Sequence, residues 1–194
     1  MYGEAYLVRF ADDFLIMFQY ERDAQRVYEA IIRRMELFGL ELSKEKTRIL
    51  PFGRNCGTRE TFDFLGFTHF NSKTRKGYYS VGHKISRKKK KQFKSNLKKW
   101  VKENRDKQFD EFMKKLNKKL TGSFNYYSLS GMIREVRSLW IHSLYVTFKW
   151  MNRRSQRRSF KLERFYVVWH ERIIHPYIHV DIWSGGKVIY NKNV

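Results

Sequence analysis

The chain has 194 residues, enough for one domain or two small ones. Hydrophobic residues make up 42% and aromatic residues 17%, which suffices for packed cores and excludes a chain that is disordered throughout. The net charge of +22 indicates a polyanionic partner, with nucleic acid the first candidate and an anionic membrane surface the second.

The charge is unevenly distributed. Residues 1–50 carry a net charge of −1, and residues 51–194 carry +23, which predicts a chemical site followed by a polyanion-binding module.

The single cysteine, Cys56, forms no internal disulfide, and no Cys/His cluster has zinc spacing. No apolar run approaches the roughly 20 residues of a membrane span, so we expect an intracellular, cytoplasmic protein. The strand pattern starts abruptly at Tyr6 without a signal peptide, and we expect further chain upstream.

The first part of the chain predicts strands and one helix. Residues 6–10 and 14–18 are rich in strand formers and predict a β-hairpin with Asp12 and Asp13 at its tip. Apolar residues at spacings of three and four predict a helix over residues 21–38, ended by Gly39. Residues 47–50 predict a short strand. Residues 62–67 and 78–81 predict another hairpin, joined by a polar loop over residues 71–77.

Beyond Gly82 the pattern is helical and basic. Ser86 is a candidate N-cap, followed by apolar stripes over residues 93–101 and 109–120, a break at residues 121–123, and a long stripe over residues 132–151. A last helix is predicted over residues 160–172, with a turn and a short strand after Trp183. The fold class is therefore α+β, with predicted domains 1–83, 84–175 and a tail 176–194.

The Asp12–Asp13 pair has two interpretations. Asp is common in turns because its side chain bonds the nearby backbone. The flanking strands are strongly apolar, however, which predicts a hairpin buried on at least one face. Two like charges at the end of such a hairpin repel each other unless a cation neutralises them, and Mg²⁺ is commonly held by one or two carboxylates plus substrate phosphates.

The hairpin resembles a known active site. Residues 9–14, Arg-Phe-Ala-Asp-Asp-Phe, resemble the polymerase hairpin of reverse transcriptases, and three further blocks are similar to that family in the correct order. Residues 40–48 resemble the block with a Lys-Thr pair, residues 62–67 the primer-grip block, and residues 122–127 the thumb motif of group II intron maturases. The resemblance implies the end of a polymerase palm followed by a helical thumb.

That resemblance also implies roles for individual residues. Asp12 and Asp13 would bind Mg²⁺, with Mn²⁺ as an alternative, and Asp12 is the expected direct ligand. Lys46 would approach the nucleotide phosphates as a general acid, although without the resemblance it reads as one exposed lysine among many. The implied primer grip, which without the resemblance reads as a core strand, comprises Phe64, Leu65, Gly66 and Phe67.

Two departures from the family pattern stand out. Phe10 occupies a position where the group II pattern most often has Tyr, so a phenolic hydroxyl is absent and modest effects on activity or fidelity are expected. The third palm carboxylate and the fingers precede this hairpin in the family, and nothing before Tyr6 matches them. We therefore expect the chain alone to be inactive in DNA synthesis, with an upstream reverse transcriptase half as a possible partner.

The basic residues predict RNA contacts. Residues 84–119 hold sixteen Lys/Arg and four acidic residues, too few acids for an ordinary solvated helix face. The aromatic residues of the motif at 122–127, with Trp140 and Trp150, either stack on unpaired bases or form core; core is favoured for the tryptophans. The expected RNA-binding residues are Lys88, Lys89, Lys90, Lys91, Lys94, Lys98, Arg153, Arg154, Arg157 and Arg158.

The favoured function is RNA-directed DNA polymerase with intron maturase activity, acting by two-metal nucleotidyl transfer. Its expected partners are intron or template RNA, a DNA primer and deoxynucleotides. The first rival is a non-catalytic RNA-binding maturase module that assists group II intron splicing. The second rival is a generic basic nucleic-acid binder. The scattered histidines give no support to a zinc endonuclease.

Overall fold

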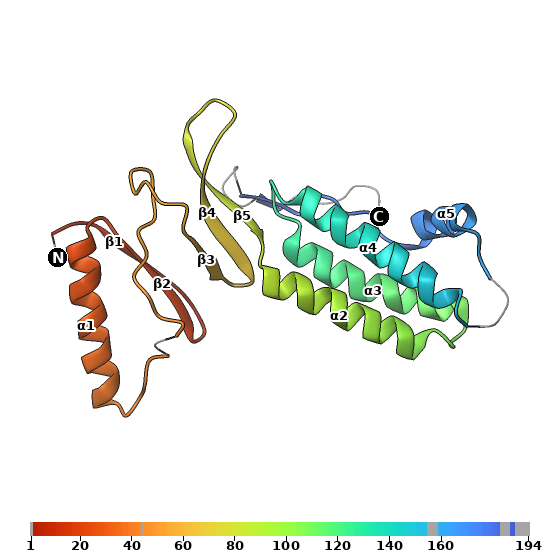
Figure 1. Ribbon diagram of the computed structural model, residues 1–194, viewed down its shortest axis with the longest axis horizontal. Helices are drawn as coiled ribbons and strands as arrows, with labels where there is room; N and C mark the ends of the chain where they lie inside the picture. Colours follow the sequence, from red (N-terminus) through yellow and green to blue (C-terminus); the bar gives the residue numbers. More distant parts are fainter. Residues whose placement is uncertain (1, 44, 155–158, 183–186, 189–194) are drawn as a thin grey trace. The chain divides into compact units, whose positions relative to one another are not determined.

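The structure is a computed structural model, which describes residues 2–43, 45–154, 159–182 and 187–188. The chain divides into two compact units. The first comprises residues 1–65 and 69–82, and the second residues 66–68 and 83–194. Their strands and helices confirm an α+β fold, with β-hairpins and a small sheet preceding a group of helices (Figure 1).

The first unit begins with the predicted hairpin. Strand β1 (Ala5–Phe10) pairs antiparallel with β2 (Asp13–Phe18) in a separate two-stranded sheet. Helix α1 (Glu21–Leu37) lies against β2 and ends before Gly39, whose φ of 67° suits glycine. The expectation of a buried hairpin face is wrong for β1, where the side chains from Tyr6 to Phe10 are exposed, because α1 covers β2 only in part.

A three-stranded sheet follows, with order β3 (Thr61–Phe64), β4 (Phe67–Lys73) and β5 (Tyr79–Ile85). The sequence predicted one hairpin here, with a single strand over residues 62–67. The structure instead breaks that strand at Leu65 and Gly66, which connect β3 to β4. The strand predicted over residues 47–50 is absent from the described chain, where this segment has no regular secondary structure.

The second unit is built on helices α2 (Arg87–Asn104), α3 (Phe109–Tyr127) and α4 (Ile133–Met151), which lie side by side, with α5 (Leu162–Arg172) against α3 and α4 (Figure 1). The predicted N-cap is confirmed, since the Ser86 Oγ accepts a hydrogen bond from the Lys89 N–H at 3.4 Å. The predicted break at residues 121–123 is wrong, because α3 runs through it to Tyr127.

The core of this unit is apolar and continuous. It joins one stripe from each helix, and its members include Leu97, Phe112, Leu116, Phe124, Val136, Leu139, Trp140, Met151, Phe165 and Trp169. The side chain of Asn152 holds the backbone of Phe160, shortly before α5. It accepts a hydrogen bond from the Phe160 N–H at 2.8 Å and donates one to the Phe160 carbonyl at 3.1 Å. After α5, the Ile174 N–H donates to Asn117 at 2.8 Å and the Ile174 carbonyl accepts from the Trp140 Nε1 at 3.0 Å.

The tail also contacts this unit. Strands β6 (Val180–Asp181) and β7 (Lys187–Val188) pair antiparallel. The backbone N–H of His179 donates to the Ser128 carbonyl at 2.7 Å, and the Ser130 N–H donates to the Val180 carbonyl at 2.9 Å. These bonds tie the tail to the connection between α3 and α4. None of the helices in the described chain has the length and apolar character needed to cross a membrane.

Candidate functional site

The aspartate pair lies at the tip of the β1–β2 hairpin. Phe10 and Asp13 form the last paired positions of the two strands, so Ala11 and Asp12 are the two-residue connection between them. Ala11 has a φ of 54°, an uncommon conformation for a non-glycine residue. Its carbonyl accepts from the Arg9 Nε at 2.9 Å, which ties the tip to the strand. Both aspartates are exposed, and no ion pair engages either carboxylate within the described residues.

Two exposed carboxylates at a hairpin tip fit a metal that is shared with a substrate, and they do not fit a metal enclosed by protein ligands alone. The described residues hold no group of three or more His, Cys, Asp or Glu side chains that could enclose a metal by themselves. Mg²⁺ does not need such a cage, because it keeps several waters and takes one or two protein carboxylates together with substrate phosphates. Asp12 and Asp13 therefore fit Mg²⁺ that arrives with a nucleotide, and they do not form a closed structural site.

Lys46 is exposed in a turn whose backbone is held locally. Its N–H donates to the Ser43 carbonyl at 3.0 Å, as does that of Thr47 at 2.9 Å. No contact joins the Lys46 side chain to either aspartate in the described structure. Its position is compatible with both interpretations made from the sequence, and its role stays a prediction.

The expected primer-grip residues form a turn and not a core strand. Phe64 ends β3 and Phe67 begins β4, while Leu65 and Gly66 between them have φ values of 50° and 82°. Positive φ at both central residues is typical of the two-residue hairpin turns that match strand twist. The Gly66 carbonyl accepts from the Ser86 N–H at 3.0 Å, so the turn is fastened to the start of α2.

Phe67 links this turn to the motif at the end of α3. Its ring stacks on Tyr126 with a centroid distance of 5.6 Å and meets Tyr127 edge-on at 5.5 Å. Phe124 is buried in the core, Tyr127 is half-buried, and Tyr126 is exposed. Of the two sequence interpretations of this motif, the structure supports helix packing for Phe124 and Tyr127. The contact with Phe67 has no signal in the local sequence, since the two segments are far apart in the chain.

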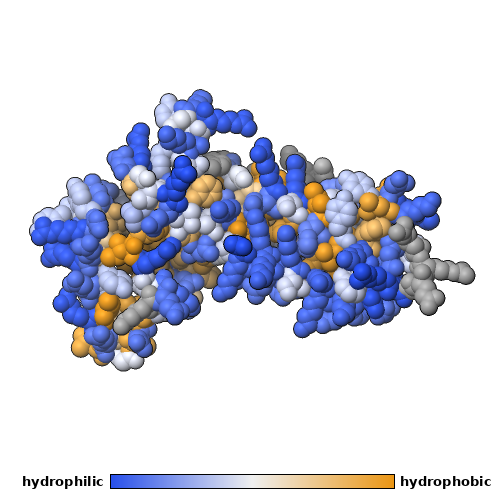
Figure 2. Space-filling model, viewed as in Figure 1, coloured by the Kyte–Doolittle hydropathy of each residue, from blue (hydrophilic) through white to orange (hydrophobic). Residues whose placement is uncertain are grey.

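Most basic residues of α2 are exposed to solvent and accessible to a binding partner. Lys88, Lys89, Lys91, Lys94 and Lys98 are exposed on this helix. Lys90 differs, because its Nζ forms an ion pair with Glu135 of α4 at 2.5 Å. Figure 2 shows hydrophilic side chains spread over the visible surface of the helices.

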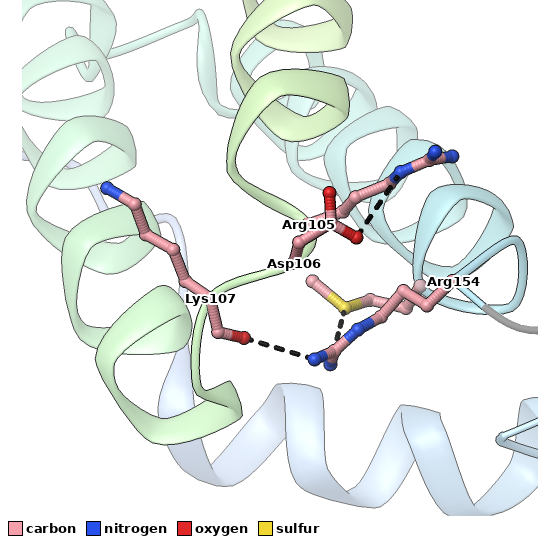
Figure 3. A network of polar contacts seen from close by, with 5 residues as sticks. Arg105, Asp106, Lys107 and Arg154 are labelled. Atoms are coloured by element: carbon pink, nitrogen blue, oxygen red, sulfur yellow. Dashed lines mark hydrogen bonds and ion pairs between the residues drawn. The ribbon is translucent and has the colours of Figure 1, made fainter.

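The second predicted basic group is split by its contacts. Arg153 is exposed, whereas the guanidinium of Arg154 donates to the Lys107 carbonyl at 3.1 Å and contacts the Met151 sulfur at 3.7 Å (Figure 3). Arg157 and Arg158 lie outside the described residues. Arg154 therefore bridges the α2–α3 connection to the end of α4, which local sequence could not indicate.

Sequence reasoning missed a group of cations around Trp150. The Lys102 Nζ lies 5.9 Å from the centroid of that ring, and the guanidinium carbons of Arg105 and Arg153 lie at 5.5 and 5.3 Å. A signal was present in the sequence, because basic residues recur at spacings of three and four along one face of α2. They are Arg87, Lys91, Lys94, Lys98, Lys102 and Arg105.

An apolar groove lies between α4 and α5. It has a volume of about 790 Å³ and is lined by residues that include Trp140, Tyr145, Tyr166 and His175. The rings of His170 and His175 lie 4.4 Å apart at its edge. Burial lowers the pKa of His175, helped by the nearby His170, so the imidazole stays neutral at neutral pH.

Comparison with known families agrees with the order of these sites. The family described as reverse transcriptase (RNA-dependent DNA polymerase) matches residues 2–69, which include the aspartate hairpin and the turn at Leu65 and Gly66. The family described as group II intron, maturase-specific domain matches residues 90–166, which cover most of α2 through α5. No curated protein matches the chain. With these two matches in this order, the chain matches the C-terminal half of a group II intron reverse transcriptase/maturase.

Proposed function

We propose that the protein takes part in RNA-directed DNA synthesis, with Asp12 and Asp13 as carboxylates of the polymerase active site. The observation that carries this proposal is the exposed aspartate pair at a tight hairpin tip inside the segment that matches the reverse transcriptase family. Exposed carboxylates that pair with no cation of the described residues are expected of metal ligands, because Mg²⁺ is bound together with the nucleotide.

The reaction is nucleotidyl transfer. The primer 3′-hydroxyl attacks the α-phosphate of a deoxynucleotide, a new P–O bond forms, and pyrophosphate leaves. Mg²⁺, when bound by Asp12 and Asp13, supplies charge neutralisation at the attacking and leaving oxygens. Lys46 stands in an exposed turn from which it would donate a proton to the departing pyrophosphate.

The turn from Phe64 to Phe67 would position the primer. Its backbone is held by the hydrogen bond from Ser86 and by the packing of Phe67 on two tyrosines. A turn fixed in this way presents a rigid surface, which favours the orientation of a reacting strand end. The exposed lysines of α2 and Arg153 would bind the phosphates of intron or template RNA, releasing counterions.

Primer extension on an RNA template with Mg²⁺ tests the proposal. The chain is assayed alone and with a reverse transcriptase fragment that carries fingers and the earlier palm strand. We expect Asp12→Asn to lower the extension rate by at least about a thousandfold, because it removes a charged ligand from the active site. Glu29→Gln serves as the matched control, since it also removes one exposed carboxylate of the same unit and lies on α1, outside the blocks that resemble the family.

Two results bear on the rival function. Extension that survives Asp12→Asn unchanged would overturn the catalytic role of the pair. Absence of extension in every combination, together with salt-sensitive RNA binding, would favour a non-catalytic maturase module that retains the palm segment as a scaffold.

A further inference from the structure

Three cations lie around Trp150, a half-buried tryptophan of the helical unit. Lys102 and Arg105 come from the end of α2 and the residue after it, and Arg153 follows the end of α4. All three lie within 6 Å of the Trp150 ring centroid, the range in which a cation is attracted to an aromatic face. Trp150 itself packs against the core, so the ring is a fixed support.

Guanidinium groups held in this way keep their hydrogen-bond donors available. An arginine stacked on a ring uses its flat face, while its N–H groups point outward from the edge of the plane. These donors match the geometry of a phosphate. Because the ring restricts the arginine side chains before any ligand arrives, less conformational entropy is lost on binding than for free lysines.

The group lacks a matching supply of negative charge. Within the described residues its one ion pair joins the Arg105 Nε to Asp106, at 3.8 Å, which is too long for a hydrogen bond (Figure 3). The Arg105 Nε is buried, and the described residues offer it no hydrogen-bond partner. The C-terminal ends of α2 and α4 carry partial negative charge and help to tolerate the cations, but they do not satisfy these N–H groups.

The basic face of α2 runs toward this group. The residues from Arg87 to Arg105 that share the face span 18 positions, or about 27 Å at 1.5 Å per residue. A strand of nucleic acid that follows the exposed Lys91, Lys94 and Lys98 would reach Lys102 and Arg105 at the far end of the helix.

We propose that Lys102, Arg105 and Arg153, positioned by Trp150, form a discrete phosphate-binding site for an RNA strand that lies along α2. The proposal rests on the RNA binding described under Proposed function and adds its location and chemistry. Trp150 is a positioning residue: it touches the arginines and not the phosphate. Arg154 is not assigned to this site, because no contact with the Trp150 ring is found for it within the described residues and its guanidinium contacts the Lys107 carbonyl and the Met151 sulfur.

The test is the salt dependence of RNA affinity, measured for the full chain with fluorescein-labelled oligouridylate between about 50 and 200 mM KCl. For single strands each phosphate contact contributes about 0.7 to the slope of log affinity against log salt. We expect Arg153→Gln to weaken binding roughly threefold to tenfold and to lower the slope by about 0.7. Arg164→Gln removes the same charge from an exposed arginine of α5 outside this site and should leave the slope unchanged.

Trp150→Leu tests the positioning role of the ring more directly, because it changes no charge. We expect it to lower the slope as Arg153→Gln does, whereas Trp150→Phe, which keeps a ring, retains most of the slope. Equal slopes for Arg153→Gln and Arg164→Gln, or an unchanged slope for both Arg153→Gln and folded Trp150→Leu, would overturn this site while leaving RNA binding intact. Absence of RNA binding by the unmodified chain would instead contradict the proposed function.

Discussion

At the scale of single residues, two glycines occupy opposite situations. Gly66 has a φ of 82°, where a side chain is strained even though a Cβ would meet its nearest neighbours, Lys89 and Tyr127, at an ordinary 3.5 Å. Gly122 lies inside α3, and a Cβ there would meet nothing within 4 Å. The positive φ at residue 66 requires glycine, whereas the glycine at residue 122 only lowers the stability of α3.

Alanine at these positions should therefore act with opposite signs. We expect Gly66→Ala to lower the free energy of unfolding by roughly 1–2 kcal/mol and Gly122→Ala to raise it by roughly 0.5–1 kcal/mol. Urea unfolding followed by tryptophan fluorescence measures both, since all five tryptophans belong to the second unit, as do both glycines. Two changes of the same sign would show that the turn or the helix is wrongly described.

At the scale of elements, α5 is placed by side chains outside it. The Asn152 amide makes two hydrogen bonds to the backbone of Phe160, eight residues further along the chain. Asn152→Ala would leave the half-buried Phe160 N–H without this acceptor, which costs about 1–3 kcal/mol of unfolding free energy. Asn152→Asp is the control, because it keeps the acceptor and loses only the donor, and it should cost less in the same urea experiment.

Elements with a strong local signal were predictable from the sequence. The β1–β2 hairpin, α1, the Ser86 cap and the long α4 follow from alternation, helical spacing and capping chemistry. The continuation of α3 past Gly122 was not predictable in this way. The helix penalty of one glycine is about 1 kcal/mol, and burial of Phe124 and partial burial of Tyr127 outweigh it through contacts with distant segments.

The candidate sites also differ in whether local sequence or tertiary contacts determine them. Asp12 and Asp13 were placed by the hairpin around them, which needs only local pattern. The turn at Leu65 was missed because a leucine with positive φ contradicts local preference and is held by Ser86 and the packing of Phe67. The cations around Trp150 join the ends of two helices, so their meeting depends on tertiary packing.

At the scale of the whole molecule, half-buried histidines make stability depend on pH. Burial lowers the pKa of His83, and burial together with Lys94 lowers that of His142. Each imidazole has a folded pKa below its ordinary value of 6.5, so the unfolded chain binds more protons just below that pH. Stability is therefore complete above this range and is lost as pH falls from 6.5 toward the folded pKa values.

Thermal melting of the full chain checks this dependence. We expect the melting temperature to be constant above about pH 7.5 and to fall between about pH 6.5 and 5.5. His142→Gln should reduce the fall, because it removes one of the groups that takes up a proton on unfolding. A melting temperature that rises on acidification through this window would contradict the sign of these shifts.

In the proposed function, the aspartate pair of the first unit serves DNA synthesis and the basic helices of the second unit bind RNA. Group II intron splicing assisted by Asp12→Asn tests this division most directly. We predict that the variant supports splicing at the unmodified rate, while replacement of Lys94 and Lys98 by Gln impairs splicing through weaker RNA binding. Loss of splicing in folded Asp12→Asn, with the lysine variant unaffected, would contradict the account.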